Sequence, residues 1–333
     1  MMKAIVISKT GGTEELVLLD VAEPDPGPDG LLVEVDAAGV NYVDTYHRSG
    51  FYDLTLPFVP GLEGGGTVVE VGSNVDGFAL GDRVGWTDVM GSYAEKIAVP
   101  ASRAVPLPEG IDSKTAAAVL LQGLTAHFLA TDTFPLFPGH RCLVHAGAGG
   151  VGLLLTQIAK LRGAEVFTTV GNEEKADLSR AAGADHVIVY SDNDFKTAVE
   201  VIAGPNAMDV VYDGVGATTF GQGLDMIRPR GMMVSFGNAS GPPPEISPLV
   251  LASKGSIYLT RPTMRHYLGD RTELLRRCSD LFQWIDQDQL RVRIGAEFPL
   301  AEAGNAHRAL EGRATTGKVI LSPASTAPPS SMD

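Results

Sequence analysis

The segment from Gly139 to Lys160 holds the residues whose types and spacing point most directly to chemistry. An apolar stretch, Cys142 to Ala146, is followed by glycines at 147, 149 and 152 and then by the apolar pattern of an amphipathic helix. Such glycines let backbone N–H groups approach a pyrophosphate at the helix N-terminus. The segment predicts a dinucleotide site, with a plain strand-to-helix turn as the alternative. The residues assigned to it are Gly147, Gly149, Gly150, Val151 and Gly152.

The elements that must position this turn recur at a near-constant spacing. Apolar runs are centred near residues 144, 168, 188, 210, 234 and 258, about 20 to 24 residues apart. The first four intervals contain plausible helices, such as Glu173–Ala182. Strands that alternate with helices predict βαβ units and a parallel sheet, and six such strands make a complete dinucleotide-binding domain.

The flanking regions follow another pattern. Up to about Pro108, short apolar runs are separated by turn clusters such as Pro24–Pro28, which predicts a compact, mainly β body. After Pro262, an amphipathic helix over about Arg271–Gln287 leads to a terminal strand, Lys318–Leu321. This strand is expected to return to the first body. The two patterns together predict an α/β protein of two domains.

Composition narrows the class of protein. The 333 residues carry a formal net charge of −14, which disfavours nucleic acid or an anionic membrane as the main partner. No apolar run is long enough to span a membrane, and the first ten residues lack the apolar region of a signal peptide. A cytoplasmic enzyme is therefore predicted.

Several motifs, in order, identify a family. The chain resembles the zinc-independent medium-chain dehydrogenases/reductases, in particular the NADPH:quinone oxidoreductase (zeta-crystallin-like) branch. Segments that carry the resemblance are 38–46, 139–160, 211–216, 230–238, 254–262 and 313–318. The resemblance implies a GroES-like, mainly β catalytic domain, residues 1–123 and 264–325, and a Rossmann NADPH-binding domain, residues 124–263. Residues 326–333, rich in Pro and Ser, are predicted to be a disordered tail.

The ligand positions of the zinc-dependent relatives hold other residues here. Asn41 falls near the first ligand position, Leu62-Glu63 stands where a His-Glu pair would be, and Gln122 lies near the third. Zinc sites need about four N, S or O ligands. We therefore expect no metal.

The resemblance also implies hydrogen-bond donors for the acceptor. Asn41, Tyr46 and Tyr52 match residues that line the nicotinamide end of the family's active site, and Asp44 is expected to orient them. Each has a plainer interpretation. Asn41 could be a turn residue, Tyr52 a rim aromatic, and Asp44 a helix cap.

The residues after the second strand of the predicted dinucleotide-binding domain decide between NAD and NADPH. NAD enzymes place an acid there to hold the ribose 2′-OH, but Val170-Gly171-Asn172 contains none. Glu173 and Glu174 follow and would offset a cation, and Lys175 could be a simple exposed helix lysine. In the family, residues matching Gly171, Lys175, Tyr190 and Arg313 surround the 2′-phosphate of NADPH, and those matching Thr125, Phe236 and Asn238 line the rest of the cofactor wall.

The leading hypothesis is NADPH-dependent reduction of quinones, by hydride or electron transfer and without a metal. One alternative is an NADPH-dependent reductase of α,β-unsaturated carbonyls or acyl thioesters. Another is a non-catalytic NADPH-binding protein with a structural or RNA-binding role. A homodimer is expected through the apolar edge at Gly255–Thr260.

Overall fold

The computed structural model describes residues 1–191 and 194–323, and the predicted tail, 326–333, lies outside them. The chain forms two compact units. The first comprises Met1–Leu121 and the chain from Val292 onward, and the second comprises Gln122–Arg291. No helix of the described residues is both long and apolar enough to cross a membrane.

The first unit is built around one long strand, β3 (Gly30–Val40), whose neighbours come from both ends of the chain. Its sheet has the order β14-β15-β3-β4-β5-β7, and β6 also pairs with β3. The other strands of this sheet are β4 (Glu63–Val71), β5 (Arg83–Thr87), β6 (Lys96–Pro100), β7 (Val105–Pro106), β14 (Ile294–Pro299) and β15 (Lys318–Ser322). β15 runs antiparallel to β3, so the predicted return of the C-terminal strand is confirmed.

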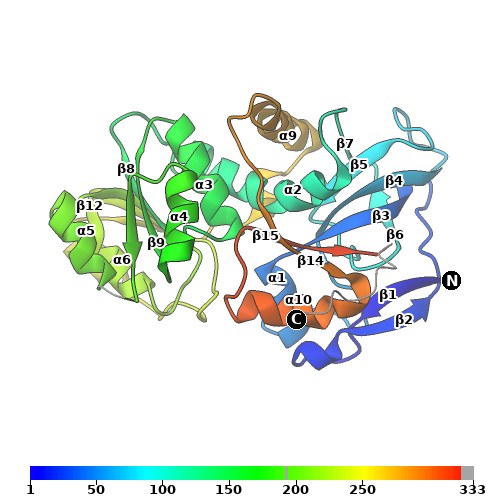
Figure 1. Ribbon diagram of the computed structural model, residues 1–333, viewed down its shortest axis with the longest axis horizontal. Coiled ribbons are helices and arrows are strands. Elements are labelled where there is room, and N and C mark those ends of the chain that lie inside the picture. Colours follow the sequence, from blue (N-terminus) through cyan, green and yellow to red (C-terminus); the bar gives the residue numbers. More distant parts are fainter. Residues whose placement is uncertain (192–193, 324–333) are drawn as a thin grey trace. The chain divides into compact units, whose positions relative to one another are not determined.

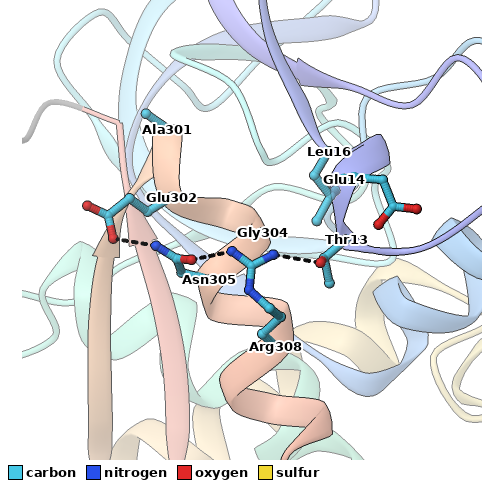
Figure 2. A pocket seen from close by; sticks show the side chains of 8 residues that line it. All are labelled: Thr13, Glu14, Leu16, Ala301, Glu302, Gly304, Asn305 and Arg308. Carbon is cyan, nitrogen blue, oxygen red and sulfur yellow. Dashed lines mark hydrogen bonds between the residues drawn. The ribbon is translucent and has the colours of Figure 1, made fainter.

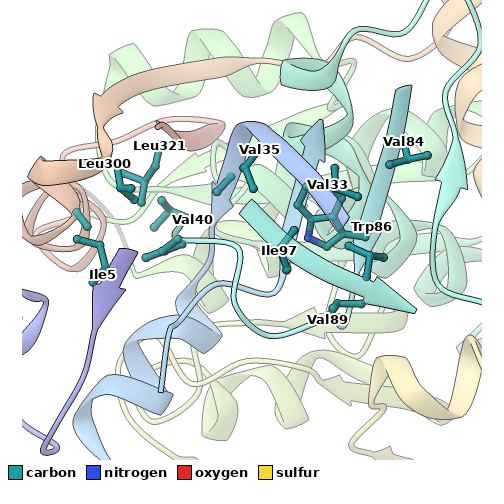
Figure 3. Packing of buried hydrophobic residues seen from close by; sticks show 14 of the residues in the cluster. Ile5, Val33, Val35, Val40, Val84, Trp86, Val89, Ile97, Leu300 and Leu321 are labelled. Carbon is teal, nitrogen blue, oxygen red and sulfur yellow. The ribbon is translucent and has the colours of Figure 1, made fainter. Parts of the chain in front are cut away.

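The core of this unit lies against β3. Val33 and Val35 on β3 pack with Trp86 of β5 and Leu321 of β15, all buried (Figure 3). A hairpin, β1 (Met2–Val6) and β2 (Val17–Val21), and the helices α1 (Tyr42–Ser49) and α10 (Ala303–Glu311) complete the unit, with short 3-10 turns at Thr13–Glu15 and Leu300–Glu302. α2 (Ser113–Phe128) contains the boundary between the units.

The second unit is the predicted parallel sheet (Figure 1). Its strands follow the order β10-β9-β8-β11-β12-β13, every pair parallel. The strands are β8 (Arg141–His145), β9 (Glu165–Val170), β10 (His186–Val189), β11 (Met208–Asp213), β12 (Ile227–Ser235) and β13 (Tyr258–Thr260). The helices are α3 (Gly150–Leu161), α4 (Glu173–Ala181), α5 (Phe195–Ala203), α6 (Phe220–Met226), α7 (Pro248–Ser253), α8 (Met264–Tyr267) and α9 (Arg271–Asp286). Counted along the chain, this order is 3-2-1-4-5-6, that of a doubly wound dinucleotide-binding sheet.

The boundary between the units differs from the predicted one. The sequence assigns residues from 264 onward to the first domain, but the second unit extends to Arg291. The reason lies in α9 and the segment before it. Buried Arg277 pairs with Asp132 at 2.7 Å, and Tyr267 stacks on Phe128 with ring centroids 4.3 Å apart. Amphipathicity predicts that this helix packs, but does not say against which partner.

Candidate functional site

The glycine turn joins β8 to α3 by a very close approach of backbone to backbone. Gly149 is the N-cap of α3, and Leu153 N–H donates the bond to Gly149 O at 2.9 Å. A Cβ on Gly152 would lie 2.2 Å from the carbonyl oxygen of Ala146, and one on Gly147 would lie 2.6 Å from Thr168 Cβ. Side chains are therefore excluded, and the first N–H groups of the helix are left to bind an anion.

This turn lies where the strand order reverses. β8 and β11 are neighbours, while β9 lies on one side of them and β12 on the other. In open α/β sheets, ligands bind at the carboxyl ends of strands at such a switch point. The end of β11 is an ordered turn, because buried Asp213 accepts N–H groups of Val215 at 2.7 Å and Gly216 at 2.9 Å.

Two further predicted cofactor residues lie at the same edge of the sheet. Phe236 and Asn238 follow β12, and the N–H of Phe236 donates to Asp213 O at 2.8 Å. The ring of Phe236 covers Gly214, where a Cβ would lie 2.8 Å from the ring. Thr125, also predicted, lies on α2 within the second unit.

The predicted 2′-phosphate residues of the second unit follow β9 and β10. Gly171 comes directly after β9, and a Cβ there would lie 3.1 Å from the hydroxyl of Tyr190. Lys175 is in the first turn of α4, where its N–H donates to Asn172 Oδ1 at 2.9 Å. Glu173 pairs with Arg180 at 3.2 Å, which offsets its charge.

Arg313 belongs to the first unit and follows α10 with a positive φ of 56°. The structure therefore brings Gly171 and Tyr190 together. The grouping of Arg313 with Lys175 stays a prediction.

The four predicted catalytic residues lie on α1 or within three residues of its ends. Asn41 is the N-cap and is buried, and its N–H donates to Asp44 Oδ2 at 2.8 Å. The plainer interpretation of Asp44 as a cap is thus correct, and it is compatible with an orienting role. Gly50 ends the helix in the left-handed region, with φ of 80°.

Tyr46 and Tyr52 form an aromatic cluster with Phe51. Ring centroids are 5.4 Å apart for Tyr46 and Tyr52, 5.5 Å for Tyr46 and Phe51, and 5.2 Å for Phe51 and Tyr52. Phe51 is 46% exposed and Tyr52 is 38% exposed. Exposed rings of this kind offer edges and faces to another flat ring.

A chain of hydrogen-bonded polar side chains leads from Asp44 through Tyr93, His307 and Arg48 to Glu311. Tyr93 donates its hydroxyl to Asp44 Oδ2 at 3.0 Å and contacts His307 Nε2 at 3.1 Å. Arg48 contacts His307 Nδ1 at 3.1 Å and forms two hydrogen bonds with Glu311, at 2.7 and 3.0 Å. Since the guanidinium donates to Nδ1, Nε2 of a neutral imidazole carries the proton and donates to Tyr93. The whole chain therefore directs donors toward Asp44.

Burial controls the protonation of this chain. It raises the pKa of Asp44 to about 7, against the opposing effects of the Asn41 N–H, the Tyr93 hydroxyl and Lys318. Asp44 Oδ1 is buried and has no hydrogen-bond partner. Burial, with the nearby charge of Arg48, lowers the pKa of His307 to about 3. His307 is thus neutral at physiological pH.

Two residues that contact Asn41 are not predicted from the sequence. Lys318 Nζ donates to Asn41 Oδ1 at 2.8 Å, and Asn41 Nδ2 donates to Glu63 Oε2 at 2.9 Å. Lys318 and Glu63 also pair with each other. A signal was present, since each is a charged residue that begins a strand. It does not say that the two strands flank the same residue.

The positions of the absent zinc ligands can now be compared with the structure. Asn41 and Glu63 belong to the cluster just described. Gln122 lies in the second unit beside the glycine turn, where a Cβ on Gly150 would lie 1.8 Å from its Oε1. Among residues 1–191 and 194–323, no three His, Cys, Asp or Glu side chains gather in a way that could hold a metal ion.

A cavity of about 280 Å³ lies elsewhere in the first unit, between the segment after β1 and α10 (Figure 2). Arg308 reaches across it and donates to Thr13 Oγ1 at 2.7 Å. The predicted site residues do not line it.

Comparison with known proteins adds independent findings. Two family models match, "Alcohol dehydrogenase GroES-like domain" over residues 27–109 and "Zinc-binding dehydrogenase" over residues 150–283. A quinone oxidoreductase of Pseudomonas aeruginosa is 42% identical, over 97% of this chain and 100% of the relative. A 2-haloacrylate reductase of a Burkholderia species is 38% identical, over 97% and 99%. The crystal structure of Escherichia coli quinone oxidoreductase complexed with NADPH superposes with a TM-score of 0.93 at 39% identity, over 97% and 99%.

Proposed function

The chain belongs to the quinone oxidoreductase family of the medium-chain dehydrogenases/reductases, and on that premise we propose that it reduces quinones with NADPH and without a metal. The observation that carries this proposal is the glycine turn at the switch point of the parallel sheet. Its glycines let backbone N–H groups at the start of α3 approach a pyrophosphate closely. The second unit is proposed as the cofactor-binding domain and the first as the catalytic domain.

The residues of the second unit fit NADPH. Gly147, Gly149, Gly150, Val151 and Gly152 would hold the pyrophosphate. Lys175, with Gly171 and Tyr190, would hold the 2′-phosphate, because no acid stands at the end of β9 to prefer a hydroxyl. Phe236, Asn238 and Thr125 would line the rest of the cofactor, and Arg313 would add a second cation at the phosphate. When bound, NADPH supplies the hydride.

The chain's own residues bind and orient the acceptor. Asn41 and the hydroxyls of Tyr46 and Tyr52 are proposed to donate hydrogen bonds to the quinone oxygens, and Asp44 to hold the start of α1 in place. The exposed rings of Phe51 and Tyr52 would lie against the flat acceptor. Positioning of this kind is the main contribution that we assign to the protein.

Hydrogen-bond donors are sufficient because a quinone is an easily reduced acceptor. Hydride addition to an ordinary ketone builds an alkoxide, whose conjugate acid has a pKa of about 16, like water. Addition to a quinone builds a species like a phenolate, with a pKa of about 10. The difference corresponds to roughly 8 kcal/mol less anionic stabilisation, at about 1.36 kcal/mol per pKa unit. The hydrogen-bond donors of the site can supply the remainder.

A panel of acceptors tests the proposal. NADPH oxidation is measured with 1,4-benzoquinone, 9,10-phenanthrenequinone, an alkenal and a 2-haloacrylate, and each assay is repeated with NADH. We expect the highest kcat/KM with a quinone and NADPH. A higher value with the alkenal or the haloacrylate would make the protein an alkene reductase, and NADPH binding without turnover would remove the enzymatic assignment.

A homodimer in the cytoplasm is part of the proposal. β13 is an edge strand of the parallel sheet, and Tyr258 and Leu259 on it are 58% and 38% exposed. An exposed apolar edge favours pairing with a second copy. Light scattering of the 35.0 kDa chain tests this assembly, and a monomer at micromolar concentration would contradict it.

A further inference from the structure

A buried ion pair holds the side chain of Asn41. Lys318 and Glu63 have side chains that are 1% and 0% exposed, and they pair directly. The carboxamide of Asn41 closes a ring with them. Its Oδ1 accepts from Lys318 Nζ at 2.8 Å. Its Nδ2 donates to Glu63 Oε2 at 2.9 Å and has a longer bond, 3.4 Å, to Gly39 O.

Strand register brings the three residues together. β15 pairs antiparallel with β3 through Val319 and Val40, so Lys318 lies beside the residue that follows β3. β4 pairs with the other side of β3 through Gly64 and Ala38, which places Glu63 beside the end of the same strand. Asn41 is therefore flanked by an ammonium from one strand and a carboxylate from the other.

The surroundings fit this pair closely. The N–H of Leu121 donates to Glu63 Oε1 at 2.6 Å, which fixes the carboxylate from its other side. A Cβ on Gly39 would lie 2.4 Å from Glu63 Oε2 and 2.8 Å from Lys318 Cε. Burial lowers the pKa of Lys318, and the carboxylate of Glu63 offsets only part of this effect. The ammonium thus depends on Glu63 for its charge.

We propose that Lys318 and Glu63 are positioning residues that set the orientation of the Asn41 carboxamide. In that orientation one N–H bonds to Glu63, and the other, which has only a long bond to Gly39 O, is strengthened as a donor to the acceptor. The inference rests on the proposed function of Asn41. A carboxamide can rotate by half a turn with little change in shape. Here that rotation would turn the NH₂ group toward an ammonium and the oxygen toward a carboxylate. Only one orientation is compatible with both neighbours, and the ammonium polarises the amide in that orientation.

A purely structural role makes a different prediction. A single substitution, Lys318→Met or Glu63→Gln, leaves one charge buried without its partner and destabilises the fold in either case. The double variant Lys318→Met/Glu63→Gln removes both charges together. A structural pair would then be dispensable, and stability and turnover would recover together.

The experiment measures melting temperature, kcat and KM for both single variants, the double variant and Asn41→Ala, with NADPH and 9,10-phenanthrenequinone. We expect the double variant to regain the wild-type melting temperature while kcat stays lower by about 100-fold, the loss typical of a displaced positioning group. KM for NADPH should change little. Adding Lys318→Met to Asn41→Ala should lower kcat no further, because Lys318 acts through Asn41.

Arg277→Met is the matched control. Arg277 is a buried cation, 1% exposed, that pairs with Asp132 and Glu273 in the second unit. The Arg277→Met variant should have a lower melting temperature than wild type but no selective loss of kcat. Full kcat in the double variant, or an additive loss in the Asn41→Ala background, would overturn the inference.

A crystal structure of the ligand-free double variant gives a readout that needs no turnover. The Asn41 side chain should lose its single orientation, and an unchanged carboxamide would also overturn the inference. If the wild type itself fails to oxidise NADPH with quinones, the proposed function fails, while this crystallographic result still decides the orientation of Asn41.

Discussion

The two candidate sites differ in what they are made of. The candidate cofactor site in the glycine turn of the second unit is made of backbone atoms. They come from one continuous segment, residues 146–152, in which the backbone packs closely. The site around Asn41 uses buried side chains from α1, β4, α10 and β15, with Tyr93 among them. A backbone site can be recognised in a linear motif, whereas a side-chain site exists only once strands are paired.

The two sites also handle charge differently. The turn presents helix N–H groups, which carry only partial charge and need no counter-ion. The Asn41 site holds full charges out of water, and each depends on a partner, as Lys318 depends on Glu63 and Arg48 on Glu311. A substitution in the side-chain site is therefore expected to alter stability and its pH dependence, while one in the turn should alter cofactor binding.

The largest expected effect is on the pH dependence of stability, through Asp44. Its folded pKa of about 7 lies above the ordinary value of 3.8. The stability that this group contributes is fully present below about pH 4 and is lost as the pH rises through about 7. Asp44→Asn removes that dependence, and its carboxamide oxygen can still accept from Asn41 and Tyr93. Relative to wild type, the variant should gain up to about 4 kcal/mol in free energy of unfolding between pH 4 and pH 8.

Urea unfolding at pH 4, 5, 6, 7 and 8 measures this difference. Asp185→Asn is the control of opposite sign. Partial burial raises the pKa of Asp185, but bonds from Lys160 and the Val166 N–H more than offset this and lower it overall. That variant should be less stable than wild type by a nearly constant amount from pH 4 to pH 8, because the contribution of a carboxyl with a lowered pKa is already almost full above about pH 4. If the difference in free energy of unfolding between wild type and Asp44→Asn stays constant with pH, Asp44 does not titrate in this range.

The next largest effect is expected in the turn. Gly152→Ala places a methyl group 2.2 Å from the backbone oxygen of Ala146, and neither backbone can move without opening the turn. The Kd for NADPH should rise by at least about 100-fold, or about 2.7 kcal/mol. Gly221→Ala on α6 is the matched control, because its Cβ would meet nothing within 4 Å. Fluorescence titration with NADPH compares the two, and equal affinities would remove the turn from the cofactor site.

The same contrast explains how much the sequence predicts. The six parallel strands are confirmed, because each is an apolar run that recurs at a regular interval. The chemistry of the glycine turn follows from local spacing. Glu63 and Lys318 were missed because their meeting depends on the register of β4 and β15 on β3. The packing of α9 within the second unit could not be predicted for a similar reason, since its partner near Asp132 is remote in sequence.

A smaller effect is expected on the preference for NADPH over NADH. If Lys175 binds the 2′-phosphate, its charge-assisted contact contributes about 1.5–3 kcal/mol. Lys175→Ala should then raise KM for NADPH by about 10- to 100-fold, with little change for NADH, which lacks the phosphate. Arg313→Ala should act in the same direction. Lys9→Ala is the control, because it removes the same charge from a residue whose side chain is 76% exposed in the first unit. Equal losses with both cofactors would assign Lys175 to folding or to the pyrophosphate.

A chelator is expected to have no effect on activity or stability. The residues near the zinc-ligand positions of the relatives are Asn41, Leu62 and Gln122, and Asn41 Oδ1 already accepts from the buried ammonium of Lys318. An ammonium beside that oxygen would repel a divalent cation, since like charges close together in a buried site repel strongly. Incubation with EDTA or 1,10-phenanthroline should leave kcat and the melting temperature unchanged, and elemental analysis should find no stoichiometric zinc. Zinc that is lost together with activity would show that this site binds metal in place of the ion pair. Lys318→Met/Glu63→Gln sharpens the comparison, because removing the ammonium should still not create a zinc site without nitrogen or sulfur ligands.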